Sequence, residues 1–164
     1  MGRRRSCFVF SFGRSVWESA YIGEKIGIGA VVRDSEGYVL ACYCSQSFGA
    51  NYYTRASNLV AIQKGLQFGI DCGLFPGVIE LDNEEVIKWI TNGLYKVTEF
   101  GTILMDIMKL SDCLERPVFH YVPKLANKAA QGLANYSLGI VSDASWLEEI
   151  PGCIDGHTET KRSG

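Results

Sequence analysis

The spacing of apolar residues changes near residue 54, and this change constrains the fold more than any other feature of the sequence. Before it, three runs have the composition and alternation of β-strands, at 7–12, 27–34 and 38–46. Residues 35–37 (SEG) supply turn chemistry between the second and third runs, which predicts a hairpin. We therefore expect this part of the chain to form a three-stranded antiparallel meander.

Beyond residue 54, helical and strand-like segments alternate. The first helical stripe has spacings of three and four and ends at Gly73: Leu59, Ile62, Leu66 and Ile70. A buried strand is expected at 77–81 and a fifth strand at 117–122, with further helices near 86–90, 100–108 and 126–134. The last helix has an alanine-rich face, which is small enough to pack close to a sheet.

This order of elements, β-β-β-α-β-α-α-β-α, predicts an α/β fold. We expect a mixed five-stranded sheet of three antiparallel and two parallel strands, with helices on both faces. Ligands of such sheets gather at the carboxyl ends of the central strands. Asp82 directly follows the strand at 77–81 and is therefore a candidate metal ligand.

The length of 164 residues fits one ordinary domain. We expect a basic tail at 1–6, the domain at 7–140, and a C-terminal extension at 141–164 that packs on the domain and has a flexible end. The net charge of -2 and the pI near 5.7 exclude a strongly basic nucleic-acid binder, although a local basic strip stays possible.

Six scattered cysteines without a CxxC pair are typical of reduced thiols in an intracellular protein. We therefore expect a cytoplasmic or nuclear location. No apolar stretch approaches the roughly 20 residues of a membrane span. The first six residues, MGRRRS, also fit the loose pattern for N-myristoylation at Gly2, which is an alternative.

Several ordered phrases point to one family: GIGAVVRDSEGYVLA (27–41), SNLVAIQKGLQFGIDCG (57–73), IELDNEEVI (79–87) and FHYVPKLANKAAQGLA (119–134). Through them the sequence resembles the reverse-transcriptase-like ribonuclease H domains of plant retroelement-derived proteins. The resemblance implies the ribonuclease H fold and a nuclease that uses two Mg²⁺ ions to cut the RNA strand of an RNA–DNA hybrid. Two close dications need several carboxylate ligands.

The resemblance implies four such carboxylates, on four separate elements. The matching positions are Phe12, Asn58, Asp82 and Gln131. Three of the four acids are therefore replaced, so we expect a degenerate site with no intact catalytic set. Asp82 would be at most a weak, residual metal ligand, and no cofactor is expected, with Mg²⁺ the ion if any binds.

Asp82 also has a purely structural interpretation. The stretch from Asp82 to Glu85 fits a capping box, with Asp82 as the N-cap of the next helix. His120, on the strand at 117–122, is interpreted as a packed strand residue rather than a general base.

A basic strip could bind a nucleic-acid backbone beside this site. Its candidates are Arg55, Asn58, Lys124, Asn127 and Lys128. The family's motif has Arg where this chain has Lys124, which keeps the attraction to phosphate but loses the bidentate fork. The alternative interpretation is that these lysines only solvate the start of a helix.

Three hypotheses follow. The first is a catalytically degenerate ribonuclease H-like domain that binds RNA or RNA–DNA hybrid without cleaving it. The second is a protein-interaction module that uses the same scaffold to hold a protein partner. The third is an active, metal-dependent ribonuclease with substituted ligands.

Overall fold

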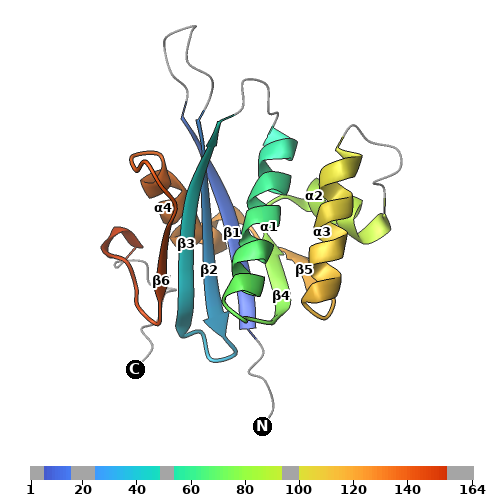
Figure 1. Ribbon diagram of the computed structural model, residues 1–164, viewed down its shortest axis with the longest axis horizontal. Coiled ribbons are helices and arrows are strands. Elements are labelled where there is room, and N and C mark those ends of the chain that lie inside the picture. Colours follow the sequence, from blue (N-terminus) through green and yellow to red (C-terminus); the bar gives the residue numbers. More distant parts are fainter. Residues whose placement is uncertain (1–5, 16–24, 49–53, 94–99, 155–164) are drawn as a thin grey trace, which may run out of the picture.

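In the computed structural model, the described residues form a six-stranded sheet with helices on both faces (Figure 1). The structure describes residues 6–15, 25–48, 54–93 and 100–154, and side chains over 27–46, 59–93 and 100–154. The strands are β1 (Ser6–Ser15), β2 (Lys25–Asp34), β3 (Val39–Phe48), β4 (Pro76–Leu81), β5 (Val118–Tyr121) and β6 (Ala144–Leu147). The helices are α1 (Thr54–Asp71), α2 (Glu84–Asn92), α3 (Gly101–Cys113) and α4 (Lys128–Ser137), with short 3-10 turns η2 (Lys124–Asn127) and η3 (Gly152–Ile154).

The strand order is β5-β4-β1-β2-β3-β6. Strands β1, β2 and β3 are antiparallel neighbours, while β4 runs parallel to β1 and β5 parallel to β4. The predicted mixed sheet, with three antiparallel and two parallel strands, is therefore confirmed. The sheet also has a sixth strand that the sequence pattern did not reveal. This strand, β6, pairs antiparallel with β3 and sets Trp146 opposite Cys42.

The predicted hairpin between β2 and β3 is confirmed. The carboxylate of Asp34 accepts hydrogen bonds from the backbone N–H groups of Glu36 and Tyr38, at 2.9 and 3.0 Å. Gly37 has a φ of 88°, a left-handed conformation that glycine adopts without steric cost. Gly73, which was predicted to end the first helix, follows α1 with a φ of 67°.

Alternation along the central strands divides the core into two layers. Ala30 and Val32 of β2 pack on the face that carries α1 and α3, and Val31 packs on the face that carries α4. Figure 1 shows α1 and α3 in front of the sheet and α4 behind it. The first layer is completed by the buried stripe of α1, which is the predicted one: Leu59, Ile62 and Leu66, with Ile70 partly buried at its edge.

Helix α4 lies unusually close to β2 because β2 has glycine at the two positions beneath it. A Cβ atom on Gly29 would lie 2.6 Å from the backbone nitrogen of Ala134 and closer still to the carbonyl oxygen of Ala130. A Cβ on Gly27 would meet the carbonyl oxygen of Ala134. The predicted close packing of the alanine face of this helix is thus confirmed. Within the described ranges, no helix is long and apolar enough to cross a membrane.

Candidate functional site

Asp82 lies directly after β4, where the sequence places the candidate ligand, and it is half-buried. The side chain of Asn127 donates a hydrogen bond to its carboxylate, and the charge of Lys124 acts on it from nearby. Burial raises the pKa of the Asp82 carboxyl above its ordinary value, and both the Asn127 hydrogen bond and the Lys124 charge oppose that rise. The structure therefore brings three of the predicted site residues together.

The end of β5 explains why these residues meet. The backbone N–H of Val122 donates to the carbonyl oxygen of Leu81 at 2.8 Å, which ties the chain after β5 to the end of β4. The turn η2 starts two residues later, after Pro123, and delivers Asn127 to the start of α4. Asn127 is only 1% exposed, so its side chain is held inside the protein rather than offered to solvent.

The interpretation of Asp82 as a helix N-cap is wrong. The N-cap of α2 is Asn83, whose side-chain oxygen accepts a hydrogen bond from the backbone N–H of Val86 at 3.1 Å. The helix begins one residue later than the capping-box pattern predicts, and Asp82, directly after β4, is engaged by Asn127 instead. Glu84 and Glu85 lie in the first turn of α2, where the helix dipole favours acidic residues.

The other implied ligand positions fall on the expected elements. Residue 12 lies in β1 opposite Ile28, which packs with Val60 and Ala61 of α1, and residue 58 lies in α1. The side chains of Phe12 and Asn58 lie outside the described ones. Gln131 is half-buried on α4, about one turn beyond Asn127, and its amide nitrogen donates to Asn135 at 3.4 Å.

The described side chains do not fit a two-metal centre. Two Mg²⁺ ions require a cluster of oxygen ligands with several negative charges. At the implied positions the only ionisable side chain is Asp82, and a neutral amide donates a hydrogen bond to it. Among the described residues, no three His, Cys, Asp or Glu side chains gather in a way that could hold a metal ion.

The structure describes the side chains of only some residues of the predicted basic strip. Lys124 and Lys128 are both exposed, on either side of Asn127 in the sequence, and the charge of Lys124 acts on Asp82. The side chain of Arg55 lies outside the described ones. His120 was interpreted as a packed strand residue, and that is wrong: it is exposed. Its strand is at the edge of the sheet, whereas α4 packs mainly over β1, β2 and β3.

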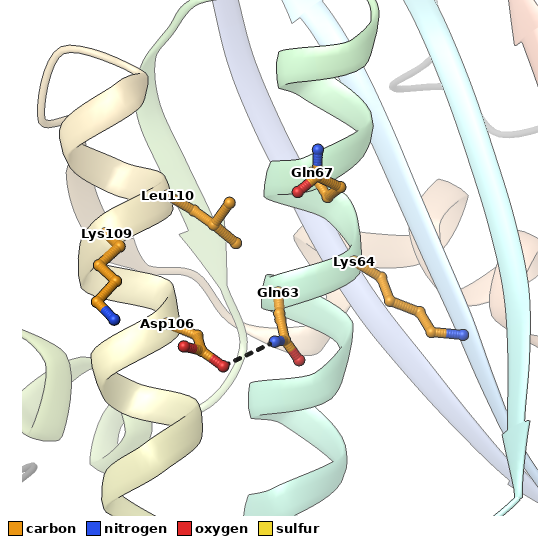
Figure 2. Close-up of a pocket in the computed structure, with 6 residues that line it drawn as sticks. All are labelled: Gln63, Lys64, Gln67, Asp106, Lys109 and Leu110. Carbon is orange, nitrogen blue, oxygen red and sulfur yellow. Dashed lines mark hydrogen bonds between the residues drawn. The ribbon is translucent and has the colours of Figure 1, made fainter.

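A hollow of about 420 Å³ lies between α1 and α3. Figure 2 shows Gln63 and Asp106 facing each other across it, joined by a hydrogen bond of 3.3 Å. Lys64 points away from Lys109, toward β3, where its Nζ donates to the hydroxyl of Ser45 at 2.9 Å. The two lysines do not converge, so this hollow lacks the paired charges of an anion site.

Sequence reasoning missed a polar network that holds the segment before β6. The carboxylate of Asp143 accepts hydrogen bonds from the hydroxyl groups of Tyr43 and Ser45, both at 2.7 Å. Trp146 of β6 packs edge-on against Tyr136 with ring centroids 6.1 Å apart. Residues 98 and 100 positions apart meet here, so no local pattern could have shown the network.

Comparison with known proteins gives a consistent result. The sequence profile of the reverse transcriptase-like family matches residues 23–137 of this chain. Among curated protein sequences, none matches it significantly.

The fold resembles several solved structures. LC11-RNase H1, solved in complex with an RNA/DNA hybrid, is 18% identical over 81% of this chain and 96% of its own, with a TM-score of 0.63. RNase H1 from the archaeon Halobacterium salinarum is 21% identical over 82% and 97%, with a TM-score of 0.60. The foamy viral protease-reverse transcriptase, also solved with an RNA/DNA hybrid, is 10% identical over 85% of this chain and 20% of its own, with a TM-score of 0.67. At these identities the likeness establishes the ribonuclease H fold.

Proposed function

Because this chain belongs to the reverse transcriptase-like family, we propose that it binds RNA or RNA–DNA hybrid at the end of β4 without cleaving it. The observation that supports this most directly is the state of Asp82. Its carboxylate, the one acid retained at the four implied ligand positions, receives a hydrogen bond from Asn127 and lies near Lys124.

Loss of cleavage follows from the charge of the implied ligand set. Each carboxylate about 4 Å from a unit positive charge contributes about 4 kcal/mol at an effective dielectric of 20, and more with a dication. Phe12, Asn58 and Gln131 carry no charge, so three such contributions are lost. An amide that donates to Asp82 also competes with a metal for the same oxygen atoms.

Retention of binding is supported by the surface around the same carboxylate. Lys124 and Lys128 are exposed at the start of α4 and can meet phosphate oxygens. Replacing carboxylates by neutral side chains also removes repulsion of phosphates. Two structural neighbours were solved with an RNA/DNA hybrid, which supports this class of ligand. The sequence motifs also lead us to propose a plant, retroelement-derived origin and an intracellular location.

Fluorescence anisotropy with a labelled RNA–DNA hybrid tests the binding. We expect Lys124→Ala to weaken the binding of all hybrid sequences alike. The loss of one phosphate contact should reduce the magnitude of the slope of log affinity against log salt concentration by roughly 0.9. Lys109→Ala is the matched control, because it removes an exposed lysine from α3 without touching the proposed site. Equal effects of the two variants would reject the site, and no binding by the wild-type protein would reject the proposed function.

The protein-interaction module is a second candidate. It is favoured by exposed apolar side chains on and just after β5: Val118, Tyr121 and Leu125. Salt dependence separates the two functions, since phosphate neutralisation gives a negative slope and docking of a protein need not.

Restoring the implied carboxylate ligands tests whether their loss alone accounts for the absence of cleavage that we propose, against the alternative of an active nuclease with substituted ligands. Phe12→Asp, Asn58→Glu and Gln131→Asp together would rebuild the implied carboxylate set. We expect Mg²⁺-dependent cleavage to appear in the triple variant and not in the wild type. If the triple variant folds, binds hybrid and stays inactive, more than the ligands has changed in this site.

A further inference from the structure

Strand β5 forms one edge of the sheet, and its outer side is open to a partner. The hydrogen bond from the N–H of Val122 to Leu81 fixes which residues face β4. In a parallel ladder alternate residues turn their backbone groups to the neighbour, so Phe119 and Tyr121 turn theirs outward. Within the described part of the chain, no strand pairs with this outer side of β5. Tyr121 is 53% exposed and Val118 is 54% exposed.

The composition of β5 does not protect this edge. Natural edge strands commonly avoid pairing with other chains by carrying a lysine, another charge or a proline within the strand. The sequence of β5 is Val-Phe-His-Tyr, and the two nearest prolines, Pro117 and Pro123, flank the strand and lie outside it. A second polypeptide in extended conformation therefore meets no fixed charge on the strand that would block a ladder.

An apolar cavity of about 470 Å³ opens at the start of the same strand. Its volume lies within the range of ligand pockets, so it has room for an apolar side chain of a partner. The lining residues come from the end of α2, the end of α3 and the first residues of β5: Ile90, Thr91, Met108, Ser111, Asp112, Arg116, Pro117, Val118 and Phe119.

Four of the nine lining residues are polar or charged: Thr91, Ser111, Asp112 and Arg116. Ser111 is 5% exposed, and its hydroxyl has no hydrogen-bond partner among the described residues. At the mouth, Arg116 pairs with Asp112 at 2.9 Å, and both side chains are largely exposed. Glu115 and Arg116 have φ values of 64° and 56°, which non-glycine residues rarely adopt. Both residues of the ion pair line the cavity.

We propose that β5 accepts an extended peptide segment of a partner protein as an additional strand, with one apolar side chain of the peptide in this cavity. The backbone of the peptide pairs with Phe119 and Tyr121, which supplies affinity. The cavity selects a residue the size of leucine, methionine or phenylalanine, which supplies specificity. The paired charges of Arg116 and Asp112 favour polar, uncharged residues on either side of it. This inference is independent of nucleic-acid binding, which uses the end of β4.

Fluorescence anisotropy with a defined peptide set tests the proposal. The probes are labelled, end-capped nine-residue peptides of alternating threonine and valine, with alanine, leucine, methionine or phenylalanine at the centre. We expect the leucine or phenylalanine peptide to bind at least about tenfold tighter than the alanine peptide, because each buried methylene adds affinity. N-methylation of the amides that would pair with β5 should lower binding by a similar factor.

Two variants locate the binding on the protein. Tyr121→Pro removes an outward N–H and leaves the ladder to β4 intact, whereas the control Tyr121→Thr keeps that N–H and suits a strand. We expect only the proline variant to lose binding. Thr91→Trp, at the exposed mouth of the cavity, should abolish the preference for leucine over alanine. Circular dichroism confirms that each variant is folded.

Three results would overturn the proposal. One is that no peptide in the set binds more tightly than about 1 mM. Another is equal binding by the proline and threonine variants at position 121. The third is sedimentation showing a dimer of the chain that Tyr121→Pro dissociates, since the edge would then serve a second copy of the protein.

Discussion

Replacing Gly29 by alanine should separate α4 from the sheet. The new Cβ would lie 2.6 Å from the backbone nitrogen of Ala134 and 2.9 Å from the Cβ of Leu133, where ordinary contacts begin at 3.4 Å. The helix must therefore move by about 0.8 Å at the nearer of these two atoms. The carbonyl oxygen of Ala130 is closer still, and backbone atoms cannot rotate aside as a flexible side chain can.

The magnitude follows from two opposing effects. Overpacking of a well-packed core costs about 1–3 kcal/mol. A glycine-to-alanine change without strain stabilises by about 0.4–1 kcal/mol through the unfolded chain. Because the obstruction is mainly backbone, we expect a net loss of about 2 kcal/mol and a fall in Tm of about 4–8 °C.

Urea unfolding, followed by circular dichroism, measures this difference. Gly152→Ala is the matched control, since nothing lies within 4 Å of a Cβ at that position and its φ is not left-handed. We expect the control to stay within about 0.5 kcal/mol of the wild type. A Gly29→Ala protein as stable as the control would show that α4 does not lie on β2 as described.

Three further predictions concern the end of β4 and the buried thiols. Asn83→Ala should cost about 1 kcal/mol in urea unfolding, through loss of the cap on Val86; an unchanged midpoint would reject Asn83 as the N-cap. Asp82→Asn should raise the stability of the folded protein at pH 7, because the raised pKa of Asp82 means that its ionised carboxyl is unfavourable in the folded state. Thermal scans should show that this gain of the variant over the wild type shrinks as the pH falls through the pKa of Asp82. Burial raises the pKa of Cys42 to about 12 and that of Cys44 to about 11, so iodoacetamide at pH 8 should leave both unmodified in the native protein by mass spectrometry; rapid labelling of either would contradict their burial.

Local patterns in the sequence predicted most of the fold. The stripe of α1 and the turn around Gly37 were predictable because each depends on residues a few positions apart. Strand β6 was not predicted, because four residues show too little alternation and the strand exists only through pairing with β3. Its anchor, Asp143, meets Tyr43 across 100 positions.

The candidate site shows the same division. Motif positions placed Asp82, Lys124 and Asn127 together, and the structure brings them into contact or close range. Asn83, not Asp82, is the N-cap of α2, and Asp82 instead accepts a hydrogen bond from Asn127, which lies 45 positions away. A local sequence pattern cannot predict a contact between residues this far apart in the sequence. His120 was misjudged because burial of a strand residue depends on its place in the sheet, and β5 is at the edge.

Cleavage of a labelled RNA–DNA hybrid, measured beside its binding, tests the central claim most directly. Purified wild-type protein is incubated with the hybrid in Mg²⁺ and, separately, in Mn²⁺, at a protein concentration that saturates binding by anisotropy. The account predicts a bound and intact RNA strand in both. Metal-dependent cleavage that is abolished by Asp82→Ala would contradict it, because the retained carboxylate would then still serve a working metal site.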